Sequence, residues 1–193
     1  MTNLVIHLEK TLGPIATGWK GDSHHDFSVV RFDQVPIAGV TAFSTLGLGR
    51  HPMQLNKSGV RIRVEFMVLI RTEQSTGPIA NVLHSIASEV VSAGRTYLRG
   101  EVANFRAPFI PESEMEAIYF TRPTYFNDVF SSASESGHQV SLVWLVPISR
   151  AESQFVAIHG WNAFEDWLET VDPDLTDISR PTMDHGDHGL TDK

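Results

Sequence analysis

The sequence predicts one α/β domain in which helices pack on the faces of a mixed, largely antiparallel sheet. Residues 140–146 form a strand that is apolar on both faces, so it needs a covering layer above and below. Residues 60–70 alternate as a strand, and an apolar stripe at helical spacing follows from Ile79 to Val91. A strand, an amphipathic helix and further strands in succession indicate a sheet with a helix across one face.

The N-terminal half is predicted to supply two helices and three strands. The first helix spans residues 2–12, because its leucines share one face and a Gly-Pro pair follows. The second helix lies between Pro78 and Gly94, residue types that suit the first turn and the end of a helix. The strands are expected at residues 28–33, 40–46 and 60–70, with a polar loop at 18–27 and a glycine-bearing loop at 45–52.

The central strand at residues 140–146 is predicted to lead into two consecutive helices. Pro147 lacks a ladder donor and is expected to end the strand. Ser149 and Glu152 stand at capping-box spacing, so a helix should begin at the residue after Ser149. Gly160 is expected to break that helix by taking a positive φ. The second helix should bury one face, formed by Phe164, Trp167, Leu168 and Val171.

The remaining segments carry weaker patterns, and they complete the domain organisation. Little apolar content remains after residue 181, so residues 1–181 are expected to form one domain and residues 182–193 a disordered, acidic, histidine-containing tail. The other expectations are a loop or edge strand at 100–111, a strand at 116–121, a possible further strand at 124–130 and a flexible turn at 131–137.

The bulk composition is that of an ordinary globular protein of 193 residues, 41% hydrophobic and 20% charged. The chain has no cysteine, which excludes disulfides, thiol catalysis and thiolate metal sites. The N-terminus lacks the pattern of a signal peptide, and no apolar run reaches the ~20 residues of a membrane span. We therefore expect a cytoplasmic protein that does not enter a membrane.

Negative charge gathers at the C-terminal end of the chain, whose overall formal charge is -8. Such a surface repels phosphate backbones, so nucleic acid is not expected as a partner, whereas a basic protein is. A purely solubilising role for this charge is the simpler alternative. The nine acids of this end are Glu165, Asp166, Glu169, Asp172, Asp174, Asp177, Asp184, Asp187 and Asp192, against Arg180 and Lys193.

Candidate catalytic and metal-binding groups are few, and each has a simpler interpretation. His185 and His188 stand beside aspartates in the tail, and His24 and His25 stand near aspartates in the polar loop. A metal site needs ligands that are held in place, which neither segment is expected to provide. Three glutamates at residues 112–116 lie in a proline-flanked loop, where solvation is expected. No nucleophile elbow or phosphate-binding loop is present. We therefore assign no catalytic residue, no metal and no cofactor.

Two long blocks resemble the C-terminal part of the suppressor of fused domain. They are L-V-W-L-V-P-I-S-R-A-E from Leu142 and H-G-W-N-A-F-E-D-W-L from His159. Further similar motifs fall in the family's order, namely V-T-A-F-S-T-L-G-L-G at 40–49, the strand at 60–70 with Glu65, and I-Y-F-T-R-P at 118–123. The resemblance covers roughly residues 25–181 and implies a suppressor-of-fused-like fold without enzymatic activity.

The resemblance also implies a partner class. Animal members bind a zinc-finger transcription factor with the help of a second domain, which this chain is not expected to share. Small bacterial members are associated with secreted polymorphic toxins and act as immunity proteins. We therefore expect a protein-binding module, an immunity protein that neutralises a cognate toxin, with its oligomeric state open. The expected contact residues are Trp161, Asp166, Glu169, Asp172 and Asp174.

Two alternatives of other classes remain open. A regulatory or scaffold domain would accept a partner strand at an exposed sheet edge. A metal-dependent hydrolase would use the histidine-rich loop or tail. Trp144 and Trp167 lie on patterns that predict core packing, whereas Trp161 stands beside a glycine at a helix start, where partial exposure is expected.

Overall fold

The structure, a computed structural model, describes residues 3–21, 26–55, 59–74, 78–105, 108 and 113–183. Its main sheet consists of β1 (Ile15–Lys20), β2 (Ser28–Phe32), β3 (Val40–Leu46), β6 (Val64–Arg71), β8 (Val102–Asn104), β9 (Met115–Thr121), β10 (Ser132–Glu135) and β11 (His138–Ser149). The helices are α1 (Asn3–Leu12), α2 (Ile79–Ala93) and α3 (Arg150–Val171). A small second sheet joins β4 (Met53–Leu55), β5 (Arg61–Ile62) and β7 (Arg95–Thr96), and short 3-10 helices occupy Leu48–Arg50, Thr72–Gln74 and Asp128–Ser131.

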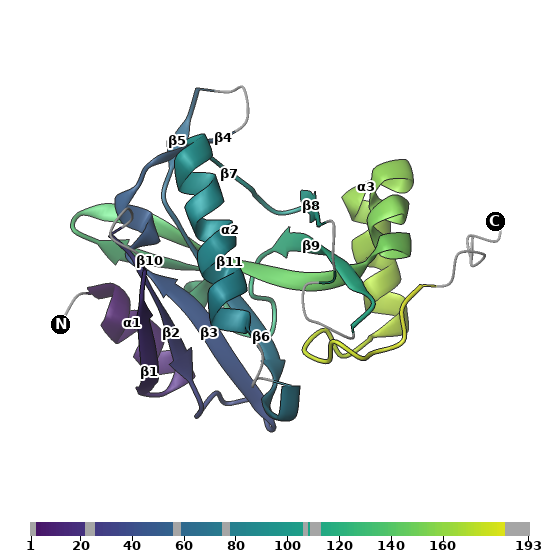
Figure 1. The fold of residues 1–193 in the computed structure, drawn as a ribbon, viewed down its shortest axis with the longest axis horizontal. Helices are drawn as coiled ribbons and strands as arrows, with labels where there is room; N and C mark the ends of the chain where they lie inside the picture. The colour runs from purple at the N-terminus through teal and green to yellow at the C-terminus, as the bar shows by residue number, and fades with distance from the viewer. Residues whose placement is uncertain are drawn as a thin grey trace.

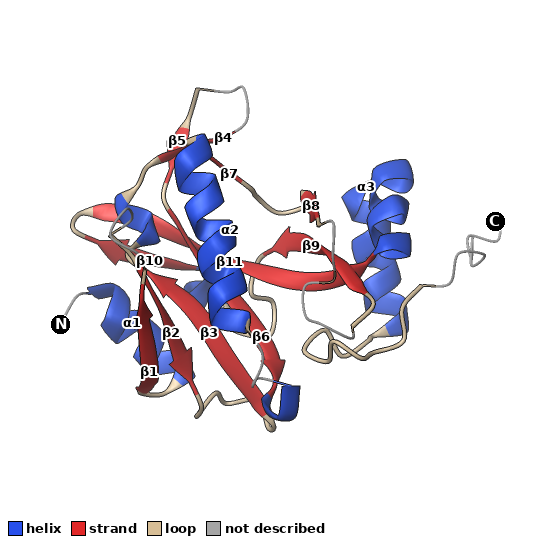
Figure 2. Cartoon of the chain, viewed as in Figure 1, coloured by secondary structure: helices blue, strands red, loops and turns tan. Residues whose placement is uncertain are grey.

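The main sheet is mixed and largely antiparallel, as predicted. Its strand order is β1-β2-β3-β6-β11-β9-β8, with β10 paired to β11. Only the β6–β11 pair of this sheet is parallel among the described strands. Figure 1 shows β11 running from the hairpin with β10 to the start of α3, with α2 across one face of the sheet. The same view coloured by secondary structure shows the strands in red and the helices in blue, with α3 beyond the end of β11 (Figure 2).

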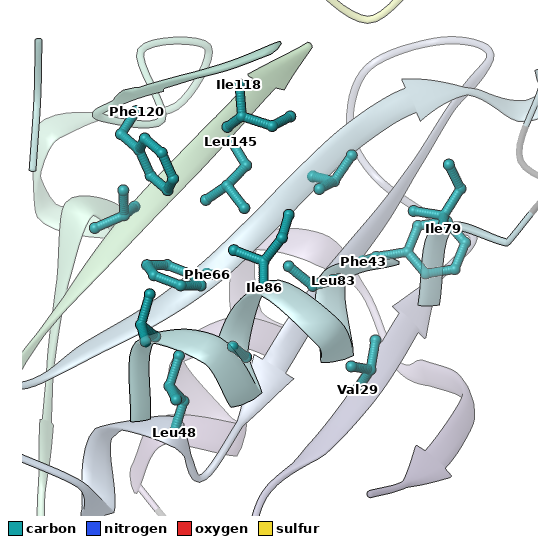
Figure 3. Packing of buried hydrophobic residues seen from close by; sticks show 14 of the residues in the cluster. Val29, Phe43, Leu48, Phe66, Ile79, Leu83, Ile86, Ile118, Phe120 and Leu145 are labelled. Atoms are coloured by element: carbon teal, nitrogen blue, oxygen red, sulfur yellow. The ribbon is translucent and has the colours of Figure 1, made fainter. Parts of the chain in front are cut away.

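Each face of the sheet has its own hydrophobic core, which explains the strands that are apolar on both sides. Phe66 and Leu145 face α2 (Figure 3), where Leu83 and Ile86 pack against them. Trp144 lies on the opposite face in the core that includes residues of α1 and α3. Burying one such side chain stabilises the fold by roughly 1.5–3 kcal/mol. Because β6 and β11 place side chains in both cores, these strands connect the two layers.

Strand β11 continues through Pro147, so the prediction that this proline ends the strand was wrong. Pro147 pairs with Ile118 of β9, whereas the pairing with β6 stops at Trp144. The Pro147 carbonyl accepts a 3.4 Å hydrogen bond from Arg180 rather than from a strand. The missing N–H therefore falls on the side of β11 that has no neighbouring strand, where it removes no ladder bond.

The start of α3 follows the prediction closely. The Ser149 side chain accepts from the Glu152 N–H at 3.2 Å, and the Glu152 carboxylate accepts from the Ser149 N–H at 2.8 Å. Gly160 interrupts the helix with φ 84° and ψ 163°, so the two predicted helices meet at a kink. Phe164 is buried as expected, but Val171 is 51% exposed, because the last turn of α3 extends beyond the sheet.

Residues 172–183, here called the C-terminal strap, return from α3 and contact the ends of the central strands β6 and β11. Arg180 forms a buried, two-pronged ion pair with Glu152 through contacts of 2.6 and 3.0 Å. Gln74 donates a 2.7 Å hydrogen bond to Asp177. Met183 is buried, and residues 184–193 of the predicted tail lie outside the described residues. The strap is therefore fixed at both the start of α3 and the end of β6.

Several weaker expectations need correction. Residues 18–20 belong to strand β1 rather than to a loop, since they pair with β2. Residues 124–130 form a turn and a 3-10 helix, in which the Asn127 side chain accepts from the Phe130 N–H at 3.1 Å. Residues 132–135 form β10 instead of a flexible turn. The strand expected at 60–70 is divided at Arg63, which donates to the Gly49 carbonyl at 2.7 Å.

A buried carboxylate organises the glycine turn after β3. Glu65 accepts hydrogen bonds from the Thr45 hydroxyl at 2.6 Å and from the Gly47, Leu48 and Gly49 N–H groups at 2.9, 3.3 and 3.0 Å. Burial raises the pKa of Glu65, and these hydrogen bonds act against that increase. All four partners are donors, so the turn fits the carboxylate anion. The predicted tight turn thus binds an anion of its own chain.

Replacing Glu65 with glutamine should destabilise the fold by on the order of 1–3 kcal/mol, because an amide N–H₂ would then face backbone donors. Urea unfolding followed by circular dichroism would measure the change. The matched control is Glu89→Gln, a charge-neutralising change at an exposed position of α2. Equal stabilities of the two variants would show that the glycine turn does not depend on the carboxylate.

Candidate partner-binding cleft

A cleft of about 290 Å³ opens between the second half of α3, strands β9 and β11, and the strap. Its walls combine aromatic, aliphatic and charged side chains, which is typical of binding sites. The lining residues from β9, β11 and the turn after β9 are Tyr119, Thr121, Arg122, Thr124, Tyr125, Trp144 and Val146, and those from α3 and the strap are Glu165, Leu168, Glu169, Asp172, Pro173 and Leu175. Arg99 joins them from the loop between β7 and β8.

Local packing explains why α3 presents this face to the cleft. Phe164 meets the Tyr119 ring edge-on at 5.2 Å, which anchors the helix segment after the Gly160 kink. Asp172 ends the helix in the left-handed region with φ 48°, a conformation that aspartate tolerates better than most residues. The Tyr125 hydroxyl then accepts from the Leu175 N–H at 3.3 Å. This contact joins the strap to the turn after β9 and completes the wall.

One wall of the cleft is an internally satisfied polar network. Arg99 donates from Nε to Glu165 at 3.0 Å and makes a second contact from Nη2 to the other carboxylate oxygen. The Tyr119 hydroxyl donates to the same carboxylate at 2.7 Å. Burial alone would raise the pKa of Glu165, but the hydrogen bonds from Arg99 and Tyr119 outweigh it and lower the pKa. Burial and the adjacent Glu165 raise the pKa of Tyr119, so the phenol stays neutral.

Trp161 supports this network from outside the cleft. The Arg99 guanidinium lies over the Trp161 ring at 4.8 Å from its centroid. Gly100 permits the contact, because a Cβ at this position would stand 2.6 Å from the Trp161 ring. Trp161 is 37% exposed, so the expected partial exposure is present. The side chain both touches solvent and holds Arg99 in place.

The structure separates the five expected contact residues. Glu169 and Asp172 line the cleft together. Asp166 is exposed on α3 but does not line the cleft. Trp161 contacts the cleft through Arg99. Asp174 forms an ion pair with Arg71 and accepts from Thr176, and these contacts make it a structural residue of the strap.

Sequence reasoning did not identify Arg99, Tyr119, Tyr125 and Trp144 as parts of one site. Tyr119 and Trp144 were visible only as alternating strand residues, and Arg99 lies in a segment without a regular pattern. Glu165 was counted among the C-terminal acids, but its engagement by Arg99 depends on a contact across 66 positions of the chain. No local signal marks such a contact.

Other candidate chemistry finds little support in the part of the chain that the structure describes. Within it, no group of three or more histidine or acidic residues is placed to hold a metal ion. His24, His25, His185 and His188 lie outside the described residues. Of the glutamates at 112–116, Glu116 pairs with Arg150 at 2.9 Å, and Glu112 is outside the description. No described helix has both the length and the apolar character needed to cross a bilayer.

Comparison with known proteins identifies the family of this chain. The suppressor of fused protein family matches residues 21–181. The chain belongs to this family. Immunity protein YqcF of Bacillus subtilis strain 168 is 26% identical over 166 residues, which cover 86% of this chain and 85% of YqcF.

Solved structures of the suppressor of fused family share the fold at low sequence identity. A homologue from Neisseria gonorrhoeae FA 1090 matches with a TM-score of 0.74 and 18% identity, over 93% of this chain and 94% of that chain. The Sufu–Fu complex gives 0.66 and 12%, over 93% and 89%. Drosophila Suppressor of Fused gives 0.61 and 11%, over 80% of this chain but 42% of that chain. The expectation of a suppressor-of-fused-like fold is therefore confirmed.

Replacing Gly100 with alanine should destabilise the protein more than replacing Gly137. Both glycines have positive φ, at 92° and 77°, so both variants lose roughly 1 kcal/mol from backbone strain. A Cβ at Gly100 also clashes with Trp161, whereas nothing lies within 4 Å at Gly137. Thermal unfolding would compare the two, and Trp161 fluorescence would report ring displacement. Equal melting temperatures would contradict the Gly100–Trp161 packing.

The Glu165 network should make stability depend on pH. A folded-state pKa below the ordinary 4.5 stabilises the fold above that value, and the contribution is lost as pH falls through the folded pKa. Wild-type protein should therefore lose its stability advantage over Glu165→Gln as pH falls below about 4.5. Urea midpoints from pH 7 to pH 3 would test this. A gap between the two proteins that stays constant with pH would be incompatible with an ionised, hydrogen-bonded Glu165.

Proposed function

We propose that this protein is an immunity protein that neutralises a cognate toxin by binding it directly, without a catalytic step. The observation that carries the proposal is the 26% identity with immunity protein YqcF, which extends over most of both chains. Membership of the suppressor of fused family and the match to the Sufu–Fu complex also support a protein-binding module. The proposed contact surface is the exposed side of α3 after Gly160, together with the cleft.

The acids on this surface differ in how the fold uses them. The carboxylates of Asp166, Glu169 and Asp172 make no hydrogen bond or ion pair with the described residues. Asp166 and Glu169 stand at i, i+3 spacing in α3, where like charges destabilise a helix by about 0.2–0.5 kcal/mol per pair, and Asp172 adds a third carboxylate at the C-cap. Packing within the domain gives no reason for this arrangement. A basic partner would convert the repulsion into a favourable interaction.

The proposed mechanism is occlusion of a basic surface on the toxin. A carboxylate-rich helix face can occupy a groove that otherwise binds a polyanion, and long-range charge attraction speeds the encounter. A basic toxin domain is therefore the favoured partner. In this proposal Trp161, with one side of its ring on Arg99, supplies an aromatic contact next to the acids.

The sheet edge at β1 supports a second candidate function, a scaffold or regulatory domain that accepts a partner strand. Residues Ala16–Lys20 are exposed, and β1 pairs with β2 on one side only among the described strands. Partner binding at such an edge would rely on backbone hydrogen bonds and would depend weakly on salt. Salt dependence thus separates the two candidates.

The first prediction of this proposal is that affinity capture at low salt retains one stoichiometric basic partner. The triple variant Asp166→Asn, Glu169→Gln, Asp172→Asn should bind that partner about tenfold more weakly, with a smaller salt dependence. The charge-matched control Glu73→Gln, Glu89→Gln, Glu114→Gln changes exposed glutamates elsewhere and should bind like wild type.

Three other outcomes would count against parts of the proposal. Unchanged affinity of the triple variant would show that the acidic face is not the contact surface. A partner that survives moderate salt would favour the β1 edge. Failure to capture any partner at either salt concentration would contradict direct toxin binding.

A further inference from the structure

We propose that the cleft beside α3 receives one arginine side chain of the protein partner. The inference deepens the proposed function and rests on it, because the proposed function identifies the partner as a protein. The chemistry of the cleft itself is carried by three features of the structure: unpaired carboxylates, an exposed aromatic wall and a buried donor without an acceptor.

The first feature is the charge that the fold leaves uncompensated. Arg99 and Glu165 neutralise each other in one wall. One turn further along α3 and at its C-cap, Glu169 and Asp172 make no hydrogen bond or ion pair with other described residues. Arg122 is the other cation of the lining, half exposed and 3.9 Å from Asp128. Two unpaired carboxylates against one exposed arginine favour a cationic ligand over an anionic one.

The second feature is a repeated arrangement of groups. On the Trp161 side, the fold holds a guanidinium, that of Arg99, between an indole ring and the Glu165 carboxylate. Elsewhere in the lining, Tyr125 is 41% exposed, and Asp172 has a carboxylate without an ion-pair partner among the described residues. An aromatic ring and an unpaired carboxylate thus line the same cleft. Guanidinium suits such a place better than ammonium, because it is planar and weakly hydrated.

The third feature is the floor of the cleft. Trp144 is fully buried, lines the cleft, and its Nε1–H has no acceptor among the described residues. Buried donors are normally satisfied. Because this atom has almost no accessible surface, a carbonyl oxygen of the partner, next to the inserted side chain, would supply the acceptor only after a small movement of the floor. Val146, Leu168 and Leu175 offer an apolar path for the methylene stem of an arginine.

The size of the cleft agrees with a single side chain. Its volume of about 290 Å³ lies at the lower end of the ~300–1,000 Å³ range of small-molecule sites and is sufficient for one side chain. Arginine is also among the residues that most often dominate the energy of an interface. An anchor of this kind would fix the register of the acidic α3 face on its partner.

The test uses N-acetyl-arginine amide as the probe and the isolated full chain as the protein. The indole N–H signals of the four tryptophans would be followed by proton–nitrogen NMR. Trp19→Phe, Trp161→Phe and Trp167→Phe variants assign three signals, so the fourth belongs to Trp144 without a change in the core. We expect a saturable shift of the Trp144 signal with the arginine probe, and at least about tenfold weaker binding of the neutral citrulline amide.

The decisive variant is Glu169→Gln with Asp172→Asn, since asparagine also tolerates the left-handed conformation at position 172. It should weaken probe binding about tenfold, whereas the control Glu73→Gln with Glu89→Gln should leave it unchanged. Equal binding of arginine and citrulline amides, an undiminished affinity of the double variant, or no shift at Trp144 would each overturn the assignment. A lysine amide that binds as well would overturn the preference for guanidinium.

The two proposals can fail separately. Capture of the partner by the double variant at undiminished affinity would overturn insertion of an arginine and leave toxin binding standing. If the chain responds specifically to the arginine probe but captures no partner, the cleft still binds guanidinium. The immunity function would then be overturned, and with it the inference that the bound arginine belongs to a protein.

Discussion

The buried ion pair between Glu152 and Arg180 is the contact on which the arrangement of α3 and the strap depends. Their side chains are 0% and 2% exposed. The Glu152 carboxylate also accepts from the Ser149 N–H, so one group joins the end of β11, the start of α3 and the strap. Breaking such a pair on one side costs about 3–5 kcal/mol, because a charge is left buried. The strap forms part of the cleft wall, and the pair therefore determines the shape of the cleft.

Three groups of acids show how differently the fold uses its carboxylates. Glu65 and Glu152 are buried and bind donors that the architecture needs. Glu165 is half-buried and shares its charge with Arg99 inside the cleft wall. The carboxylates of α3 after Glu165 are exposed and lack a partner in the described chain. A net charge of -8 conceals these differences, because buried and paired carboxylates are not available to a basic partner, whereas exposed ones are.

The fold explains how a small domain can present such a surface. The sheet is covered on both faces, and β11 carries buried side chains into both cores, so α3 can stand at its end with one side free. The Gly160 kink redirects the helix, and Phe164 fixes its second half against Tyr119. The outward side of α3 after Gly160 takes no part in packing the core.

The sequence by itself determined the features that short-range chemistry controls. They include the Ser149–Glu152 capping box, the positive φ at Gly160, the apolar stripe of α2 and the strands with a regular period. Only the tertiary structure decided the strand order, the path of β11 through Pro147 and the meeting of Arg99, Tyr119 and Glu165. The reason is physical: caps and periodicity act within a few residues, whereas an ion pair or a cleft depends on which distant segments the packed core brings together.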